Sequence, residues 1–134
     1  MTSGECRGND EERQGAKPKP HPLELEERTA KFGEAVIRFA KAIPHDAVGR
    51  PLISQLVRAA TSVGANYCEA DDAGSRKEFR HRISIFRKEA RETKHWLRMV
   101  VAADGRLRDQ AKPFWQEAKE LNLIFSAIFR NTKP

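Results

Sequence analysis

Residues 75–103 read SRKEFRHRISIFRKEARETKHWLRMVVAA, and this stretch decides the fold class. Apolar or small side chains recur in it at alternating steps of four and three residues. This spacing keeps one face of a helix buried and is typical of a helix-bundle seam. Ser75 and Glu78 have the pattern of a capping box at the start, and Asp104–Gly105 predicts the end. The expected seam is Phe79, Ile83, Phe86, Ala90, Thr93, Leu97 and Val100.

The same spacing predicts three further helices. One covers residues 25–43 and ends at Pro44, whose ring cannot continue a helix. Another is expected over Pro51–Tyr67, because proline suits a first helical turn, and residues 71–74 break it. The last runs over about residues 109–131. The expected seams are Leu25, Thr29, Phe32, Val36, Phe39 and Ile43; then Ile53, Leu56, Ala60, Val63 and Tyr67; and finally Phe114, Ala118, Leu121, Phe125 and Ile128.

These four segments define an architecture. No segment alternates apolar and polar residues for long, so no strand is expected. The connections are short, which makes neighbouring helices antiparallel. We therefore expect an all-α protein, an antiparallel up-down four-helix bundle over residues 23–132, preceded by a disordered, almost wholly polar tail over residues 1–22. Pro113 leaves open a later start of the last helix, since proline is tolerated only near a first turn.

Composition narrows the class of protein. The chain has 134 residues, enough for one domain, and a net charge of +6 that favours a polyanionic partner, either nucleic acid or an anionic membrane surface. Cys6 falls in the tail and Cys68 in a helical pattern, so no structural disulfide is expected and a reducing compartment fits. No apolar run approaches the ~20 residues that span a bilayer. We expect a soluble, cytoplasmic protein that does not insert into a membrane.

The chain has more apolar residues than a lone bundle requires. Single apolar side chains on a surface are common and need no special cause. A large exposed patch, however, is rare on a monomer, so the surplus favours a subunit interface and a homo-oligomer. The surplus residues, beside or away from the seams, are Ile37, Ile85, Trp96, Val101, Trp115, Leu123, Ile124 and Phe129.

A stripe of cations runs along the helix expected at residues 75–103. This segment holds nine Lys or Arg and three Glu, an excess of +6. On a helical wheel, six of the cations fall between roughly +80° and +140° from Phe86, whereas the three glutamates fall between roughly −60° and −120°. A helix stabilised by its own ion pairs would mix the two signs instead. The six candidate nucleic-acid-binding residues are Arg76, Arg80, Arg87, Arg91, Lys94 and Arg98.

Three partners could neutralise this stripe. Acids of a neighbouring helix or subunit are one, with Glu117 and Glu120 as candidates. Phosphates of RNA or DNA are a second, bound electrostatically and with little sequence selectivity. An acidic protein is the third. Aromatic residues are not interleaved with the cations of this helix, which favours recognition of duplex or structured RNA by shape over a single-strand platform.

A line of polar residues on the second expected helix indicates a structural role. Their spacing is 4, 4 and 3, so they share one helix face. We interpret them as a buried or interfacial hydrogen-bond ladder that meets acids of the third helix and fixes register, in preference to a ligand site. The ladder consists of Arg58, Ser62, Asn66 and Glu69, with Glu89 and Glu92 as the opposing acids.

Catalytic and metal chemistry finds little support. Glu92 and His95 form one E-x-x-H pattern, but a di-iron bundle needs two copies plus core glutamates on the other helices. No nucleophile elbow, P-loop or dinucleotide fingerprint occurs. Cys68 has no evident base beside it. We therefore expect a protein without catalytic residues, metal or cofactor.

Three stretches resemble a known family. They are RAATSVGANYCEA (58–70), SRKEF (75–79) and KEARETKHWL (88–97), and they are similar to the bacterial four-helix-bundle proteins encoded in intervening sequences of 23S ribosomal RNA. The resemblance covers about residues 23–132. By this resemblance, the polar motif is Ser62, Asn66, Glu69, Glu89 and Glu92.

The resemblance implies an assembly and a class of partner. Members form ring-shaped homopentamers, have no established enzymatic activity, and are related to the accessory protein of diversity-generating retroelements. That relative is a basic pentamer that binds a reverse transcriptase and nucleic acid. The chain would then be a non-enzymatic RNA- or DNA-binding accessory protein, or a scaffold for an acidic partner such as a reverse transcriptase. Residues 71–74 (DDAG) depart from the glycine-rich or basic turn of many members.

Overall fold

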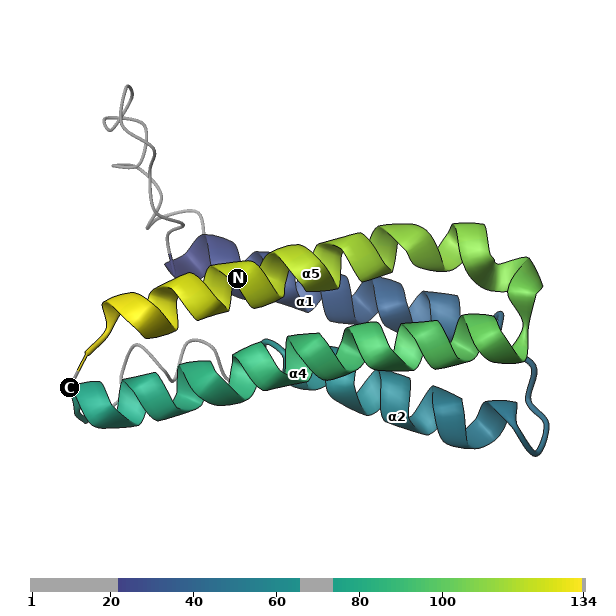
Figure 1. Cartoon of the computed structure of the whole chain (residues 1–134), viewed down its shortest axis with the longest axis horizontal. Coiled ribbons are helices and arrows are strands. Elements are labelled where there is room, and N and C mark those ends of the chain that lie inside the picture. The colour runs from purple at the N-terminus through teal and green to yellow at the C-terminus, as the bar shows by residue number, and fades with distance from the viewer. Residues whose placement is uncertain (1–21, 66–73, 134) are drawn as a thin grey trace, which may run out of the picture.

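The computed structural model of the chain describes residues 22–65 and 74–133 (Figure 1). These residues contain no strand, so the expected all-α class is confirmed for the described part. The tail expected over residues 1–22 lies outside it, except that α1 already begins at Pro22. The helices are α1 (Pro22–Ala40), α2 (Gly49–Ser62), α4 (Arg76–Ala103) and α5 (Arg108–Asn131), with the short 3-10 helix η3 (Gly105–Leu107) before α5.

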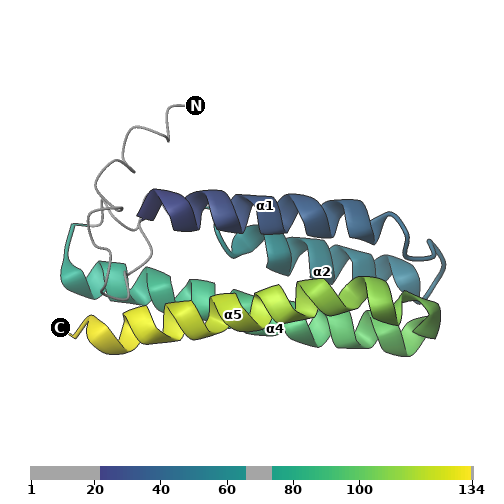
Figure 2. The ribbon, with the colours of Figure 1, turned by 90° about the horizontal axis from the view of Figure 1, so that it is seen from above.

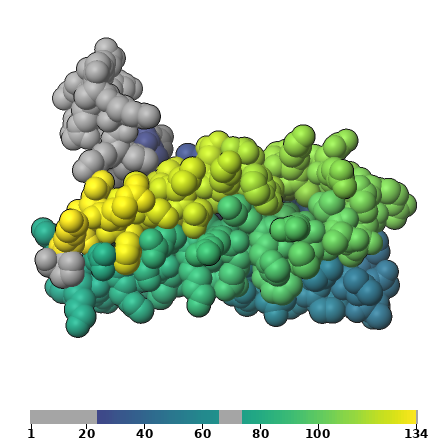
Figure 3. Space-filling view, in the orientation of Figure 1, coloured from purple at the N-terminus to yellow at the C-terminus, as the bar shows by residue number. Residues whose placement is uncertain are grey.

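The four long helices lie along one axis and run alternately up and down (Figures 1 and 2). α1 pairs with α2 and α4 pairs with α5, while α4 also packs along α2. α1 meets α5 across the remaining side. This is the antiparallel up-down bundle that the spacing predicted. α4 and α5 lie side by side and form most of the face shown in the space-filling view, with part of α2 visible at its lower right (Figure 3).

The core is built from the expected seams. All six seam residues expected for the first helix are buried, including Ile43, which lies just beyond the end of α1. Six of the seven seam residues of α4 are buried, with Phe79 half-buried. Phe86 meets Phe125 of α5 at a centroid distance of 5.8 Å, a contact that adds about 0.5–1.5 kcal/mol to the area term. Side chains buried in this way contribute roughly 1.5–3 kcal/mol each.

The second helix differs from its expected bounds at both ends. It begins at Gly49, before Pro51, because the Asp46 carboxylate accepts hydrogen bonds from the N–H groups of Val48 (3.1 Å) and Gly49 (2.7 Å). It ends at Ser62 rather than at Tyr67, which lies outside the described residues. Val63 is still buried, although it lies beyond the helix.

A close approach to α1 accompanies the end of α2. Gly64 packs so tightly on Thr29 that a Cβ atom at residue 64 would overlap the threonine side chain. The Thr29 hydroxyl donates to the carbonyl oxygen of Leu25 at 2.8 Å, so this side chain is held in place from its own helix. The contact between α1 and the end of α2 therefore requires glycine at residue 64.

The start signals of the last two helices act largely as expected. The Ser75 hydroxyl accepts from the N–H of Glu78 at 3.0 Å, as in a capping box. The Glu78 carboxylate accepts from Gly74 at 3.1 Å rather than from Ser75.

α5 begins at Arg108 with Pro113 inside it, so the later start is wrong. Pro113 lies one turn into the helix and removes a single N–H, a loss that the packed helix tolerates.

Half of the surplus apolar residues are explained within one chain. Trp96, Val101, Ile124 and Phe129 pack against the core, so they need no subunit partner. The other four are between 37% and 58% exposed: Ile37, Ile85, Trp115 and Leu123. Over residues 22–65 and 74–133, no helix combines the length and the apolar character needed to cross a membrane.

Candidate nucleic-acid interface

One arginine of α2 binds both acids of the α4 polar motif. Arg58 lies 3.2 and 3.4 Å from the two carboxylate oxygens of Glu89 and 2.7 Å from an oxygen of Glu92. The hydrogen bond to Glu92, more than any other contact, raises the pKa of Arg58 above its ordinary value. Ser62 is half-buried one turn further on, while Asn66 and Glu69 lie outside the described residues. The structure therefore brings Arg58, Glu89 and Glu92 of the expected ladder together.

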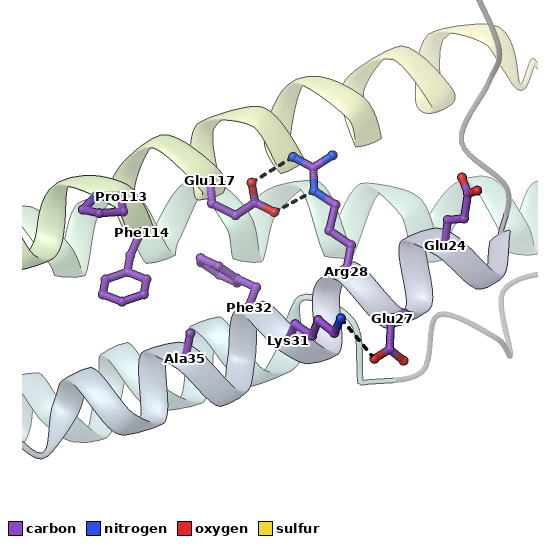
Figure 4. A pocket seen from close by; sticks show the side chains of 9 residues that line it. All are labelled: Glu24, Glu27, Arg28, Lys31, Phe32, Ala35, Pro113, Phe114 and Glu117. Carbon is purple, nitrogen blue, oxygen red and sulfur yellow. Dashed lines mark hydrogen bonds and ion pairs between the residues drawn. The ribbon is translucent and has the colours of Figure 1, made fainter. Parts of the chain in front are cut away.

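A second arginine binds two acids of α5 in the same way. Arg28 of α1 donates to both oxygens of Glu117 at 2.6 and 2.8 Å (Figure 4). It also donates to Glu120 at 2.8 Å. These contacts, chiefly the hydrogen bond to Glu117, raise the pKa of Arg28 above its ordinary value. Within one chain, Glu117 and Glu120 therefore do not neutralise the α4 stripe, whereas pairing of the stripe with acids of another subunit stays a prediction. Both glutamates project from the side of α5 that faces α1, away from α4.

The pair Arg28–Glu117 also borders a groove between α1 and α5. The groove has a volume of about 560 Å³. Phe32, Ala35 and Phe114 form its apolar part, and Pro113 lies beside Phe114 (Figure 4). Charged side chains of both signs surround these apolar residues, so the groove has no single electrostatic character.

Three stripe cations of α4, Arg80, Arg87 and Lys94, lie against aromatic rings of α5 and not against acids. Arg80 lies with its guanidinium carbon 3.7 Å from the centre of the Phe129 ring, and Arg87 lies 4.2 Å from the same ring. Asn122 of α5 donates to the carbonyl oxygen of Arg87 at 2.9 Å, which fixes the two helices in register. Arg76 donates to the carbonyl oxygen of Lys133 at 3.4 Å. The stripe therefore follows the junction between α4 and α5.

Trp115 of α5 lies within this run of cations. The Lys94 ammonium is 5.2 Å from the indole centre and that of Lys119 is 5.6 Å away. Arg98, Arg108 and Lys112 line a hollow that also borders Trp115. The expectation concerned aromatics of α4 alone, and the structure adds Trp115 from the adjacent helix to the run of cations.

We call the combined set the α4/α5 cationic surface. Within the described residues, none of its nine cations has a carboxylate at ion-pair distance. Its α4 part extends over about 33 Å, from the rise of the helix between residues 76 and 98. The surface consists of Arg76, Arg80, Arg87, Arg91, Lys94 and Arg98 of α4, with Arg108, Lys112 and Lys119 of α5.

The residues first considered for metal chemistry have other neighbours. Glu92 faces Arg58, and His95 contacts the edge of Trp96 at a centroid distance of 4.9 Å. Among the described residues, no three His, Cys, Asp or Glu side chains are grouped so as to hold a metal ion.

Fold and surface together define a class: a four-helix bundle with four glutamates bound by arginines of neighbouring helices and nine cations along one outer junction. The chain belongs to the 23S rRNA-intervening sequence protein family, whose model matches residues 22–127. It is similar to the crystal structure of a protein of unknown function from the S23 ribosomal protein family of Bacteroides thetaiotaomicron, with a TM-score of 0.71 and 26% sequence identity. That match covers 79% of this chain and 95% of the other. No curated protein is similar enough to count as a match.

Proposed function

We propose that this protein is a non-enzymatic nucleic-acid-binding accessory protein that contacts the phosphates of RNA or DNA through the α4/α5 cationic surface. One observation carries the proposal. Four glutamates of the two helices, Glu89, Glu92, Glu117 and Glu120, are bound by Arg58 and Arg28 on other sides. Within the described residues, the nine cations of the surface therefore lie together without a carboxylate at ion-pair distance. Like charges three or four residues apart on a helix repel each other, and a row of phosphates would relieve that repulsion.

Such binding depends steeply on salt. A protein that neutralises about six phosphates loses on the order of 10³-fold in affinity between 50 and 200 mM salt. Fluorescence anisotropy with a labelled RNA hairpin measures this dependence directly. A flat salt response would contradict phosphate binding.

Charge reversal locates the surface. Arg91, Arg98 and Lys112 are exposed, so their triple change to Glu should leave the fold intact and abolish RNA binding. Reversal of Arg80, Arg87 and Arg91 should do the same, with a greater effect on stability because two of these residues stack on Phe129. The matched control reverses Arg38, Lys41 and Arg50, which are exposed outside the surface. Equal loss in the control would show that net charge alone governs binding.

The same surface suits an acidic protein, such as a reverse transcriptase. Arg80 and Arg87 rest on Phe129, and a guanidinium held flat can bind a carboxylate with two parallel hydrogen bonds as well as a phosphate. Polyglutamate of the same charge as the RNA separates the two candidates. Equal affinity at physiological salt would favour the protein partner, and a strong preference for RNA would favour the nucleic acid.

We also propose that the protein acts as a ring-shaped homopentamer. Its resemblance to ring-forming relatives supports this, as do the exposed side chains of Ile37, Ile85 and Leu123. Light scattering after size exclusion measures the subunit number. A monomer at micromolar concentration would contradict the proposal.

A further inference from the structure

A hollow between α4 and α5 lies within the cationic surface. Its volume is about 220 Å³, below the range of about 300–1,000 Å³ found for pockets that hold drug-sized ligands. It therefore suits a group of the size of one small ring system. Three apolar side chains, Leu97, Val101 and Ala111, contribute to its lining.

Trp115 borders this hollow and is the aromatic with accessible surface here. Trp115 is 37% exposed, whereas Phe129 is half-buried and its ring is covered by two guanidinium groups. Two lysines lie near the indole: Lys94 of α4, and Lys119, which lies one turn after Trp115 on α5. The hollow lies on the other side of Trp115 along the two helices, because its lining comes from the turns after Lys94 on α4 and before Trp115 on α5.

The charges around the hollow share one sign. Arg98, Arg108 and Lys112 line it, and no acid belongs to its lining. An apolar lining, an exposed indole and three cations match the two parts of a nucleotide, a flat base and an anionic phosphate. Stacking on an aromatic side chain is sequence-tolerant because every base has a π-face.

We propose that this hollow, the Trp115 pocket, accepts one unpaired nucleobase, which stacks on Trp115 while the adjoining phosphates contact Arg98, Arg108 and Lys112. The inference rests on the proposed function and narrows its ligand to nucleic acid with unpaired nucleotides, such as a loop, a bulge or a single strand. A base within a perfect duplex is stacked on its neighbours and cannot enter. Phosphate contacts along the rest of the surface remain available to duplex and single strand alike.

Tryptophan fluorescence reports on the pocket. The chain has two tryptophans, so Trp96→Phe leaves Trp115 as the sole emitter. The Trp96 indole N–H is buried without a hydrogen-bond partner among the described residues, so this change removes no such bond. A 12-residue oligouridine should quench Trp115 fluorescence, whereas a duplex with the same number of phosphates should bind with little quenching. Equal quenching by both would overturn the inference.

Affinity gives a second, independent readout. Trp115→Leu keeps an apolar side chain but removes the aromatic face, and should weaken oligouridine binding about 5- to 100-fold with less than a twofold change for duplex. Trp115→Phe should restore most of the loss. Val48→Ala, at an exposed apolar residue outside the cationic surface and outside the proposed subunit interface, is the control and should change neither affinity. Equal weakening for oligouridine and duplex, or no rescue by Phe, would contradict base stacking.

The outcomes separate the two proposals. If duplex and oligouridine both fail to bind the unaltered protein, the proposed function fails and the pocket with it. If duplex binds with the expected salt dependence but Trp115→Leu weakens oligouridine binding no more than duplex binding, only the pocket proposal fails. If uridine monophosphate quenches Trp115 with the same midpoint as the oligouridine, the site is one for free nucleotides, and the assignment to an unpaired base of a strand is wrong.

Discussion

The guanidinium of Arg80 stacks 3.7 Å above the ring of Phe129 and also donates from Nε to the carbonyl oxygen of that residue at 3.4 Å. One aromatic residue near the end of α5 thereby orients a cation of α4 by its ring and by its backbone. Arg87, two turns further along α4, lies over the same ring. The cationic surface is consequently ordered by contacts between α4 and α5 and not by acids, which leaves its charge available to a ligand.

Phe129→Leu should weaken RNA binding without unfolding the protein. Leucine keeps an apolar contact with the core, so the free energy of unfolding should fall by less than about 1.5 kcal/mol. Loss of the two cation–π contacts, each worth about 0.5–1 kcal/mol at exposed sites, should release Arg80 and Arg87 and reduce RNA affinity several-fold. Urea titration and anisotropy measure the two effects separately. Unchanged RNA affinity would show that the orientation of these arginines is irrelevant.

Gly64→Ala should destabilise the bundle, and Gly33→Ala should not. A Cβ at residue 64 would overlap Thr29, and overpacking of this kind costs about 1–3 kcal/mol. A Cβ at Gly33, in the interior of α1, would lie 3.5–3.6 Å from Thr61 and Ala60, an ordinary contact. That change should gain about 0.5–1 kcal/mol, because alanine loses less backbone entropy in a helix. Thermal or urea unfolding of both variants tests the contrast, and a neutral Gly64→Ala would refute the close approach.

The sequence predicted what depends on one helix at a time. The 4-3 spacing placed the seams of α1, α4 and α5 correctly because burial repeats with the helical turn. It placed the end of α2 at Tyr67 rather than at Ser62. The close approach of Gly64 to Thr29, just beyond Ser62, is a contact with another helix that the pattern of one helix does not contain. A wheel drawn for one helix likewise cannot say which neighbour Glu117 will meet.

The Trp115 pocket could have been anticipated from the sequence. Arg108, Lys112, Trp115 and Lys119 repeat the steps of 4, 3 and 4 and therefore share one face of α5. On this face the steps of four and three are occupied by cations and one aromatic residue, whereas in the seams the same steps are occupied by core residues. The antiparallel pairing of α4 and α5 sets this face beside the stripe of α4, and the sequence of α5 alone does not contain that pairing.

Acid should remove the contribution of one ion pair at the turn between α4 and α5. A side-chain hydrogen bond from Arg106 lowers the pKa of Asp104 below its ordinary value. A carboxyl group with a depressed folded pKa stabilises the fold above its unfolded pKa of about 3.9, and this stability is lost as the pH falls through the folded pKa. Asp104→Asn, which can still accept from the Arg106 N–H, should therefore be less stable than the unaltered protein at pH 7. Urea titrations should show the gap closing below about pH 4, and a gap independent of pH would exclude the charge as its cause.

Arg28 and Glu117 should be coupled in stability but not required for RNA binding. The pair is bidentate but roughly one-third exposed, so solvent screening limits its coupling energy to about 0.5–1 kcal/mol in a double-mutant cycle with Arg28→Met and Glu117→Gln. The exposed pair Lys31–Glu27, 3.9 Å apart, is the matched control and should show less coupling. Because Glu117 faces α1, Glu117→Gln alone should alter RNA affinity by less than about twofold. A large gain in affinity would mean that this carboxylate acts on the cationic surface after all, contrary to its position against Arg28.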